Sequence, residues 1–344
     1  MTSHVTKSQS SRLAVAWRWA KVAAAATIMG TLWRYGALDL ASISALWHSP
    51  GLGLTSAILL FAPLFLLSLR WQLLMRAQSF HLTYRSALRI TAIGQFFNTF
   101  MPGGIGGDAM RFYYIFGRVT GRRTAALMSL IVDRLLGLGA LLMLASAAIL
   151  ANRNLFQGSG ALRSFAEIVI AATTIGILGG LVIVLLPDAL LGNLKRPLKR
   201  LGRVGSTVVD CVDAVSVYRK QLPMLAVGLV VSLLIQIWSI AGCIAVAQMF
   251  DFFGLNWLEF SVAMLLAQFA NQVPITPGGF GVGESAFYMI ARLMTGVDAP
   301  YGTIFLTVRL LSMAGALYGA VVWIGFRPEV ALDSMNSRIE PKGP

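Results

Sequence analysis

Two stretches of sequence interrupted by glycine and proline decide the fold of this chain. The first reads QFFNTFMPGGIGGDAMR over residues 95–111, and the second reads QFANQVPITPGGFGVGE over residues 268–284. Pro102 and Pro277, which begin the two PGG segments, lie 175 residues apart. The same offset relates Arg134 to Arg309, and each arginine is followed by two leucines. The combined match indicates an internal duplication.

The composition around these stretches is that of a membrane protein. Of the 344 residues, 57% are hydrophobic and 12% are charged, against about 25% charged residues in soluble domains. This balance excludes an ordinary soluble enzyme and a disordered chain. Several apolar runs approach the roughly 20 residues with which a helix crosses a bilayer. We therefore expect an all-α polytopic membrane protein.

The apolar runs predict six full membrane spans and two broken stretches. The spans lie at about 13–33, 51–69, 124–150, 166–186, 223–250 and 300–326. The broken stretches lie near residues 86–110 and 258–291. No small-residue cleavage site follows the first apolar run, so we expect it to stay in the protein as a helix rather than serve as a signal peptide.

The net charge of +14 predicts the orientation of the chain, because cytoplasmic loops are rich in lysine and arginine. Both flanks of the first broken stretch are basic. They carry Arg70, Arg76, Arg85 and Arg89 before it, and Arg111, Arg118, Arg122 and Arg123 after it. A segment that begins and ends on the cytoplasmic side must turn back within the bilayer. The loop before the second broken stretch carries Asp251 and Glu259 and no basic residue, so this stretch is expected to be re-entrant from the opposite face.

The resulting domain organisation is a single transmembrane domain, residues 13–326, between cytoplasmic tails at 1–12 and 327–344. It holds inverted-topology repeats at about 51–150 and 223–326. A span at 166–186 and a basic cytoplasmic segment at 187–222 link them. Inverted repeats are typical of transporters with a substrate site at the repeat interface. We expect the basic segment to lie on the anionic membrane surface rather than to bind nucleic acid.

The glycines and prolines have a physical role at membrane depth, where non-helical backbone is tolerated only against protein or a water-filled cavity. Proline ends one half-helix, and the glycines permit a tight reversal. The predicted hairpin residues are Pro102, Gly103, Gly104, Gly106, Gly107, Pro277, Gly278, Gly279, Gly281 and Gly283. A second half-helix is expected to begin near Asp108 or Glu284, and its free N–H groups suit an anion. The alternative is a purely structural turn in which both acids stabilise a helix N-terminus.

The two arginines are the candidate substrate ligands. Each lies about ten residues into an apolar span, about 15 Å deep, where an arginine costs roughly 2.5–3.5 kcal/mol to insert. Its planar guanidinium matches phosphate and carboxylate. The alternative is a permanent ion pair of Arg134 and Arg309 with Asp108, Asp133 or Glu284. Asp133 is a poor partner for Arg134, because adjacent helical residues point about 100° apart.

Four amides accompany the arginines. Asn98 and Asn271 are expected to line the cavity as neutral donors or to hydrogen bond between helices. Hydrogen bonding between helices is the favoured interpretation for Gln95 and Gln268.

The motifs resemble a known family. Arg70-Trp71, the segment FFNTFMPGGIGGDAMR, Val132-Asp133-Arg134, and PGGFGVGE with a following arginine are similar to the lysylphosphatidylglycerol synthase transmembrane region, a flippase-like family of integral membrane proteins. The resemblance covers residues 15–326. It implies a protein of the bacterial inner membrane that moves lipid head groups between leaflets. It carries over six candidate site residues: Asp108, Arg111, Asp133, Arg134, Glu284 and Arg309.

One departure from the family affects the expected activity. Bifunctional members carry an aminoacyltransferase domain after the membrane region, whereas 18 residues follow position 326 here. We therefore do not expect this chain to synthesise lysyl-lipid.

The leading hypothesis is a flippase for an anionic phospholipid or polyprenyl-linked head group, with the lipid as its partner and a homo-oligomer possible. A secondary transporter of a small organic anion, or a membrane-embedded lipid-carrier transferase, are the alternatives. The transferase is disfavoured because no recognisable catalytic motif is present. The three histidines form no cluster with cysteine, so no metal or cofactor is expected.

Overall fold

The computed structural model describes residues 44–101, 106–116, 123–185, 216–273 and 279–325, with isolated positions between 23 and 39, at 209, 213 and 214, and at 276. Within these residues the chain forms helices and no strand. Both predicted tails, most of the first predicted span and most of the basic segment lie outside the described residues.

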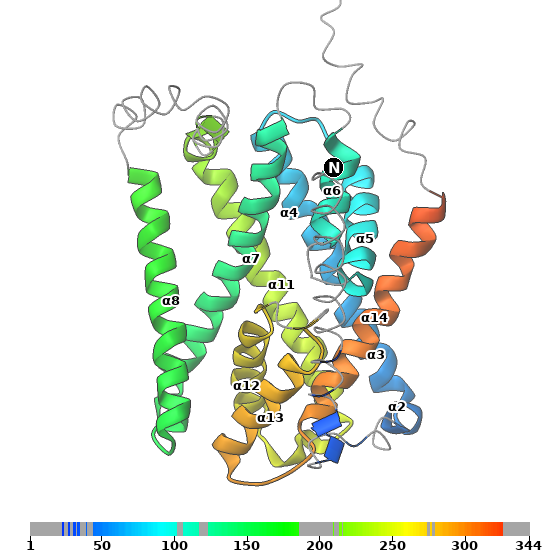
Figure 1. Ribbon diagram of the computed structural model, residues 1–344, viewed down its shortest axis with the longest axis vertical. Helices are drawn as coiled ribbons and strands as arrows, with labels where there is room; N and C mark the ends of the chain where they lie inside the picture. The colour runs from blue at the N-terminus through cyan, green and yellow to red at the C-terminus, as the bar shows by residue number, and fades with distance from the viewer. Residues whose placement is uncertain are drawn as a thin grey trace, which may run out of the picture.

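Long apolar helices cross the whole molecule (Figure 1). They are α7 (Arg123–Ala151), α8 (Gly160–Leu185), α11 (Leu222–Gln248), α14 (Gly302–Gly325) and the continuous pair α3 (Pro50–Phe61) and α4 (Pro63–Ala77). All five are long and apolar enough to cross a membrane. They correspond to the second to sixth predicted spans. The chain is therefore a multi-pass helical membrane protein. Short elements flank them, namely α2 (Ala45–His48), η2 (Arg153–Phe156) and η3 (Asp251–Gly254).

The span formed by α3 and α4 is longer than the sequence predicted. The expected end at residue 69 is wrong, because α4 continues to Ala77. Pro63 interrupts the backbone hydrogen bonding between the two helices, but Ala62 keeps helical angles (φ −54°, ψ −35°), so the chain continues in the same direction. Arg70 therefore lies inside a helix and not in a cytoplasmic loop.

Each Gly/Pro stretch separates two short helices that contact each other. The first pair is α5 (Tyr84–Phe100) and α6 (Gly106–Phe116), and the second is α12 (Trp257–Ala270) and α13 (Val282–Thr295). In Figure 1 the first pair lies in the upper half of the molecule and the second pair in the lower half. At 11–17 residues, these helices are about 16–26 Å long, shorter than a hydrocarbon core of about 30 Å.

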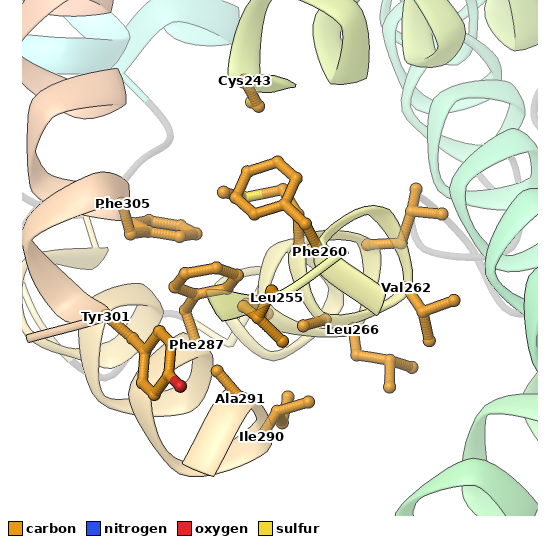
Figure 2. Packing of buried hydrophobic residues seen from close by; sticks show 14 of the residues in the cluster. Cys243, Leu255, Phe260, Val262, Leu266, Phe287, Ile290, Ala291, Tyr301 and Phe305 are labelled. Carbon is orange, nitrogen blue, oxygen red and sulfur yellow. The ribbon is translucent and has the colours of Figure 1, made fainter. Parts of the chain in front are cut away.

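The largest core cluster holds the second pair against α14. Figure 2 shows the rings of Phe260, Phe287 and Phe305 close to one another, one from each of α12, α13 and α14. Phe260 and Phe287 meet edge to face with centroids 5.5 Å apart, an arrangement favoured by the ring quadrupoles. The rings fix the second helix pair relative to the long helix that carries Arg309.

The same long helix also contacts the first pair. Gly319 of α14 is buried against α5, and a side chain at this position would collide with the backbone of Ala92. Small residues allow this close approach of two helices within a membrane. Helix α14 thus connects the two helix pairs, which bring the candidate site residues to the middle of the molecule.

Candidate functional site

Arg134 belongs to a cluster at the break of the first helix pair. Its Nε donates to Asp108 Oδ2 at 2.7 Å, and its Nη2 lies 3.5 Å from Asn98 Oδ1. Asp108 lies in the first turn of α6, Asn98 in the last turns of α5, and Arg134 near the middle of α7. The cluster therefore joins both short helices to a long helix.

Arg309 belongs to a second cluster with the same composition. Its Nε donates to Glu284 Oε1 at 2.6 Å, and its Nη2 donates to Asn271 Oδ1 at 3.3 Å. Glu284 lies in the first turn of α13, and Asn271 ends α12. The same guanidinium atoms contact the same classes of acceptor as in the first cluster. The geometry therefore matches the duplication that the sequence indicates.

The two clusters differ in how much of the arginine side chain is exposed. The Arg309 side chain is 11% exposed and Glu284 is fully buried. Arg309 Nη2 also donates to the carbonyl of Gly279 at 2.9 Å, and its guanidinium lies over the ring of Phe280. By contrast, half of the Arg134 side chain is exposed. The second cluster is closed, and the first is accessible.

The sequence left two alternative roles open for Asp108 and Glu284, a helix N-terminal acid or an ion-pair partner, and both residues have both roles. Each lies in the first turn of a helix and pairs with an arginine. Glu284 Oε2 additionally accepts from the backbone N–H of Gly281 at 2.9 Å, which completes a capping box. The arginines are therefore held by side chains of the protein itself in this structure.

Asp133 belongs to a buried ion cluster behind Arg134. Its two oxygens accept from Arg70 Nε at 2.7 Å and from Arg111 Nη1 at 3.3 Å. Arg70 also donates to Ser232 of α11 at 2.8 Å, and Arg111 lies over the ring of Trp71. No side-chain hydrogen bond or ion pair joins Asp133 to Arg134 among the described residues, as their adjacent positions on α7 predict.

The first cluster and this buried group share an excess of positive charge. Arg111 Nη1 lies 3.9 Å from Asp108, so the two groups are continuous. Three guanidinium groups, those of Arg70, Arg111 and Arg134, face two carboxylates among the described residues. The Nε of Arg111 is buried and has no hydrogen-bond partner there. The group therefore has one more guanidinium than it has carboxylates among the described residues, whereas Arg309 and Glu284 balance each other.

The hairpin glycines have two different roles. Gly279 and Gly281 have φ values of +71° and +82°, as the predicted reversal requires. Gly106, Gly107 and Gly283 instead lie in the first turn of the second helix of each pair. A side chain at these positions would collide with neighbouring groups, such as the ring of Phe305 at Gly283. Pro102, Gly103, Gly104, Pro277 and Gly278 lie outside the described residues.

A cavity of about 340 Å³ lies between α3, α4, α5, α11, α12 and α14. Gln95 and Gln268, which occupy matching positions in the two Gly/Pro stretches, both line it. Neither glutamine makes a hydrogen bond to another described residue. The expectation that they bond between helices is therefore wrong, because both side chains face the cavity.

Sequence reasoning missed Arg70, Ser232 and the cavity glutamines as site residues. Arg70 lies where the apolar run ends, and a charge at that point is typical of a loop. Its partners Asp133 and Ser232 are 63 and 162 residues away. The Arg70-Trp71 pair in the family motif was the available signal. No group of three or more potential metal ligands occurs within the described part of the chain.

The fold and the clusters define a multi-pass helical membrane protein with charged groups held inside its bundle. The family model of the lysylphosphatidylglycerol synthase TM region matches residues 18–319. The chain therefore belongs to this family, which places it among membrane proteins of lipid-related function. No curated protein and no solved structure matches the chain.

Proposed function

We propose that this protein is a flippase that moves an anionic lipid, bearing a phosphate on its head group, across the membrane. The observation that carries the proposal is the cluster of three arginines and two aspartates, in which the side chain of Arg134 is half exposed. A lipid phosphate does not cross hydrocarbon unaided, because burying an unpaired charge there is so costly. Arg134 would take the place of water around the phosphate, and the positive charge of the neighbouring Arg70 and Arg111 would support it.

The surroundings of Arg134 favour a lipid over a soluble anion. Its neighbours on the same face of α7, three, four or seven residues away, are the exposed apolar side chains of Leu127, Ile131 and Leu138. Exposed apolar side chains on a membrane-spanning helix suit contact with acyl chains. A lipid could therefore bring its phosphate to Arg134 while its tails stay in the bilayer. A soluble anion would need a polar path instead.

The proposed mechanism uses the two helix pairs as re-entrant hairpins of an inverted-topology repeat. Support comes from their short helices, their positions in opposite halves of the molecule, and the matching Arg134 and Arg309 clusters. One cluster is accessible and the other closed, which is the asymmetry expected of one state of such a repeat. Rocking of one repeat against the other would exchange the two states and alternate access. The lipid would be moved without chemical change.

The charge at the two ends of the bundle supports the proposed orientation, with cytoplasmic termini in a bacterial inner membrane. Helices α7 and α11 begin, and α8 and α14 end, at the upper end in Figure 1. The described basic residues at or near this end include Arg76, Arg85, Arg89, Arg123, Arg219 and Lys220, and Asp213 is an acid beside them. The other end carries Asp251, Glu259, Glu167 and Asp298 beside Arg153, Arg163 and Arg292. We assign the first end to the cytoplasm.

Reconstitution into liposomes tests the function. Proteoliposomes would receive a fluorescent phosphatidylglycerol or a polyprenyl phosphate, and quenching from outside would report the leaflet of the label. In parallel, uptake of radiolabelled glycerol phosphate would be measured. We expect lipid movement above that of protein-free liposomes and no uptake of the soluble anion. Uptake of glycerol phosphate without lipid movement would instead establish an organic-anion transporter.

A further inference from the structure

The cavity between the two halves has a lining without charge. Its polar side chains are those of Gln95, Thr99, Ser239, Gln268 and Ser312, and the remaining lining is apolar or glycine. An ammonium group would find no carboxylate there. An apolar occupant would leave the amides without partners. The lining therefore suits a neutral polar group.

The repeated motif Gln-x-x-Asn links this cavity to the arginine clusters. In each half the glutamine lines the cavity, while the asparagine three residues later contacts the arginine of its own cluster. Three residues of helix rise by about 4.5 Å, so each glutamine lies within one turn of its cluster. Val308, beside Arg309, lines the cavity as well. The cavity therefore lies within a few ångströms of each cluster along the helix, close enough for one lipid head group to reach both.

The chemistry of the two glutamines points to hydroxyl groups. Each primary amide offers two donors and one oxygen acceptor, and neither is used by another described residue. Hydroxyls both donate and accept, so a polyol can pair with both halves of an amide, whereas an ammonium only donates. An apolar occupant would cover both amides and leave them unpaired, whereas a hydroxyl-bearing one would pair with them.

We propose that this cavity binds the uncharged, hydroxyl-bearing part of a lipid head group, with Gln95 and Gln268 as its hydrogen-bonding partners. This inference rests on the proposed flippase function and adds the substrate class. It assigns the two halves of the chain a shared specificity site at their interface. Phosphate recognition stays with the arginine cluster, and head-group selection belongs to the glutamines.

Binding of short-chain lipids to the purified full chain in detergent tests the inference by calorimetry. Dihexanoyl phosphatidylglycerol would be compared with dihexanoyl phosphatidylethanol, which has the same phosphodiester charge but no hydroxyl. We expect wild type to prefer phosphatidylglycerol by roughly tenfold, the scale of one or two neutral hydrogen bonds. The double variant Gln95→Leu/Gln268→Leu is expected to bind both lipids equally. Each single variant is expected to lose part of the preference, which keeps the test open if the double variant does not fold.

Gln236→Leu is the matched control, because Gln236 is a glutamine of α11 that does not line the cavity. It is expected to keep the wild-type preference. Equal binding of the two lipids by wild type, or an unchanged preference in the glutamine variants, would overturn the inference. Because binding is measured without translocation, a protein that shows this preference but moves no lipid would refute the flippase function and leave the specificity site standing.

Discussion

At the scale of the residue, the arginines differ in how completely the protein neutralises them. Arg309 is held by a fully buried Glu284, an asparagine and a backbone carbonyl. Arg134 is held by a partly exposed Asp108 and lies next to an excess guanidinium. A ligand phosphate can therefore compete for Arg134 more readily than for Arg309. In the state described here, Arg134 is therefore the arginine that is open to a ligand, and Arg309 is closed off.

The buried carboxylate of Asp133 is predicted to be a main determinant of stability. Asp133→Asn would leave Arg70 and Arg111 buried without a facing negative charge, and breaking a buried ion pair costs about 3–5 kcal/mol. A large fall in the unfolding temperature in detergent is expected. Glu167→Gln is the control, since its pair with Arg163 is exposed and worth about 0–1 kcal/mol. Equal effects of the two variants would contradict the assignment of Asp133.

Alanine substitution is predicted to separate the roles of the two arginines. Arg309→Ala would leave the buried carboxylate of Glu284 without its positive partner and with the N–H of Gly281 as its hydrogen-bond donor. The unfolding temperature should therefore fall strongly. Arg134→Ala leaves a partly exposed Asp108 and should change the unfolding temperature little. Thermal unfolding of both purified variants provides the comparison. The interpretation that the protein holds Arg309 more firmly than Arg134 does not survive if Arg134→Ala is the less stable protein.

At the scale of the element, the close contact of α5 and α6 sets the geometry of the first cluster. Gly107 leaves no room for a side chain, because a methyl group there would meet the backbone of Gly94 and the Cβ of Asn98. Gly94 in turn provides the space beside Arg111. The two glycines thus bring Asn98 and Asp108 within reach of the same guanidinium.

Gly107→Ala is predicted to push the two short helices apart and displace Asn98 and Asp108. Overpacking of this kind costs about 1–3 kcal/mol, and lipid movement should fall as well. Gly139→Ala in α7 is the control, because no neighbouring atom lies within 4 Å of the place that the new methyl group would take, so wild-type behaviour is expected. Unfolding temperature and translocation are the two measurements. Wild-type values for Gly107→Ala would show that the helix contact is not needed.

The elements of this fold were largely predictable, and the contacts between them were not. Apolar runs located the long helices, and the Gly/Pro stretches located the breaks, because both depend on local sequence. The partners of Asp133 could not be predicted, since Arg70 and Arg111 reach it from other helices and Ser232 completes the group from α11. For the same reason, the matching positions of Gln95 and Gln268 did not reveal that both face one cavity.

At the scale of the whole molecule, the proposed orientation places the two ends of the bundle in different compartments. His81 lies between α4 and α5, and Val297 lies between α13 and α14. In a background with Cys211 and Cys243 replaced by alanine, His81→Cys should react with a membrane-impermeant maleimide from the cytoplasm. Val297→Cys should react from outside. Labelling of both from the same side would refute the assignment of the ends.

The measurement that tests the central claim most directly is the rate of lipid movement in the Arg134→Ala variant. Proteoliposomes of wild type, Arg134→Ala and Arg163→Ala would be compared with fluorescent phosphatidylglycerol. Arg163 is an exposed arginine paired with Glu167 on the surface of α8 and serves as the control. Arg134→Ala is expected to fall to the rate of protein-free liposomes, while Arg163→Ala is expected to keep the wild-type rate. A folded Arg134→Ala variant that moves the lipid at the wild-type rate would contradict the central claim.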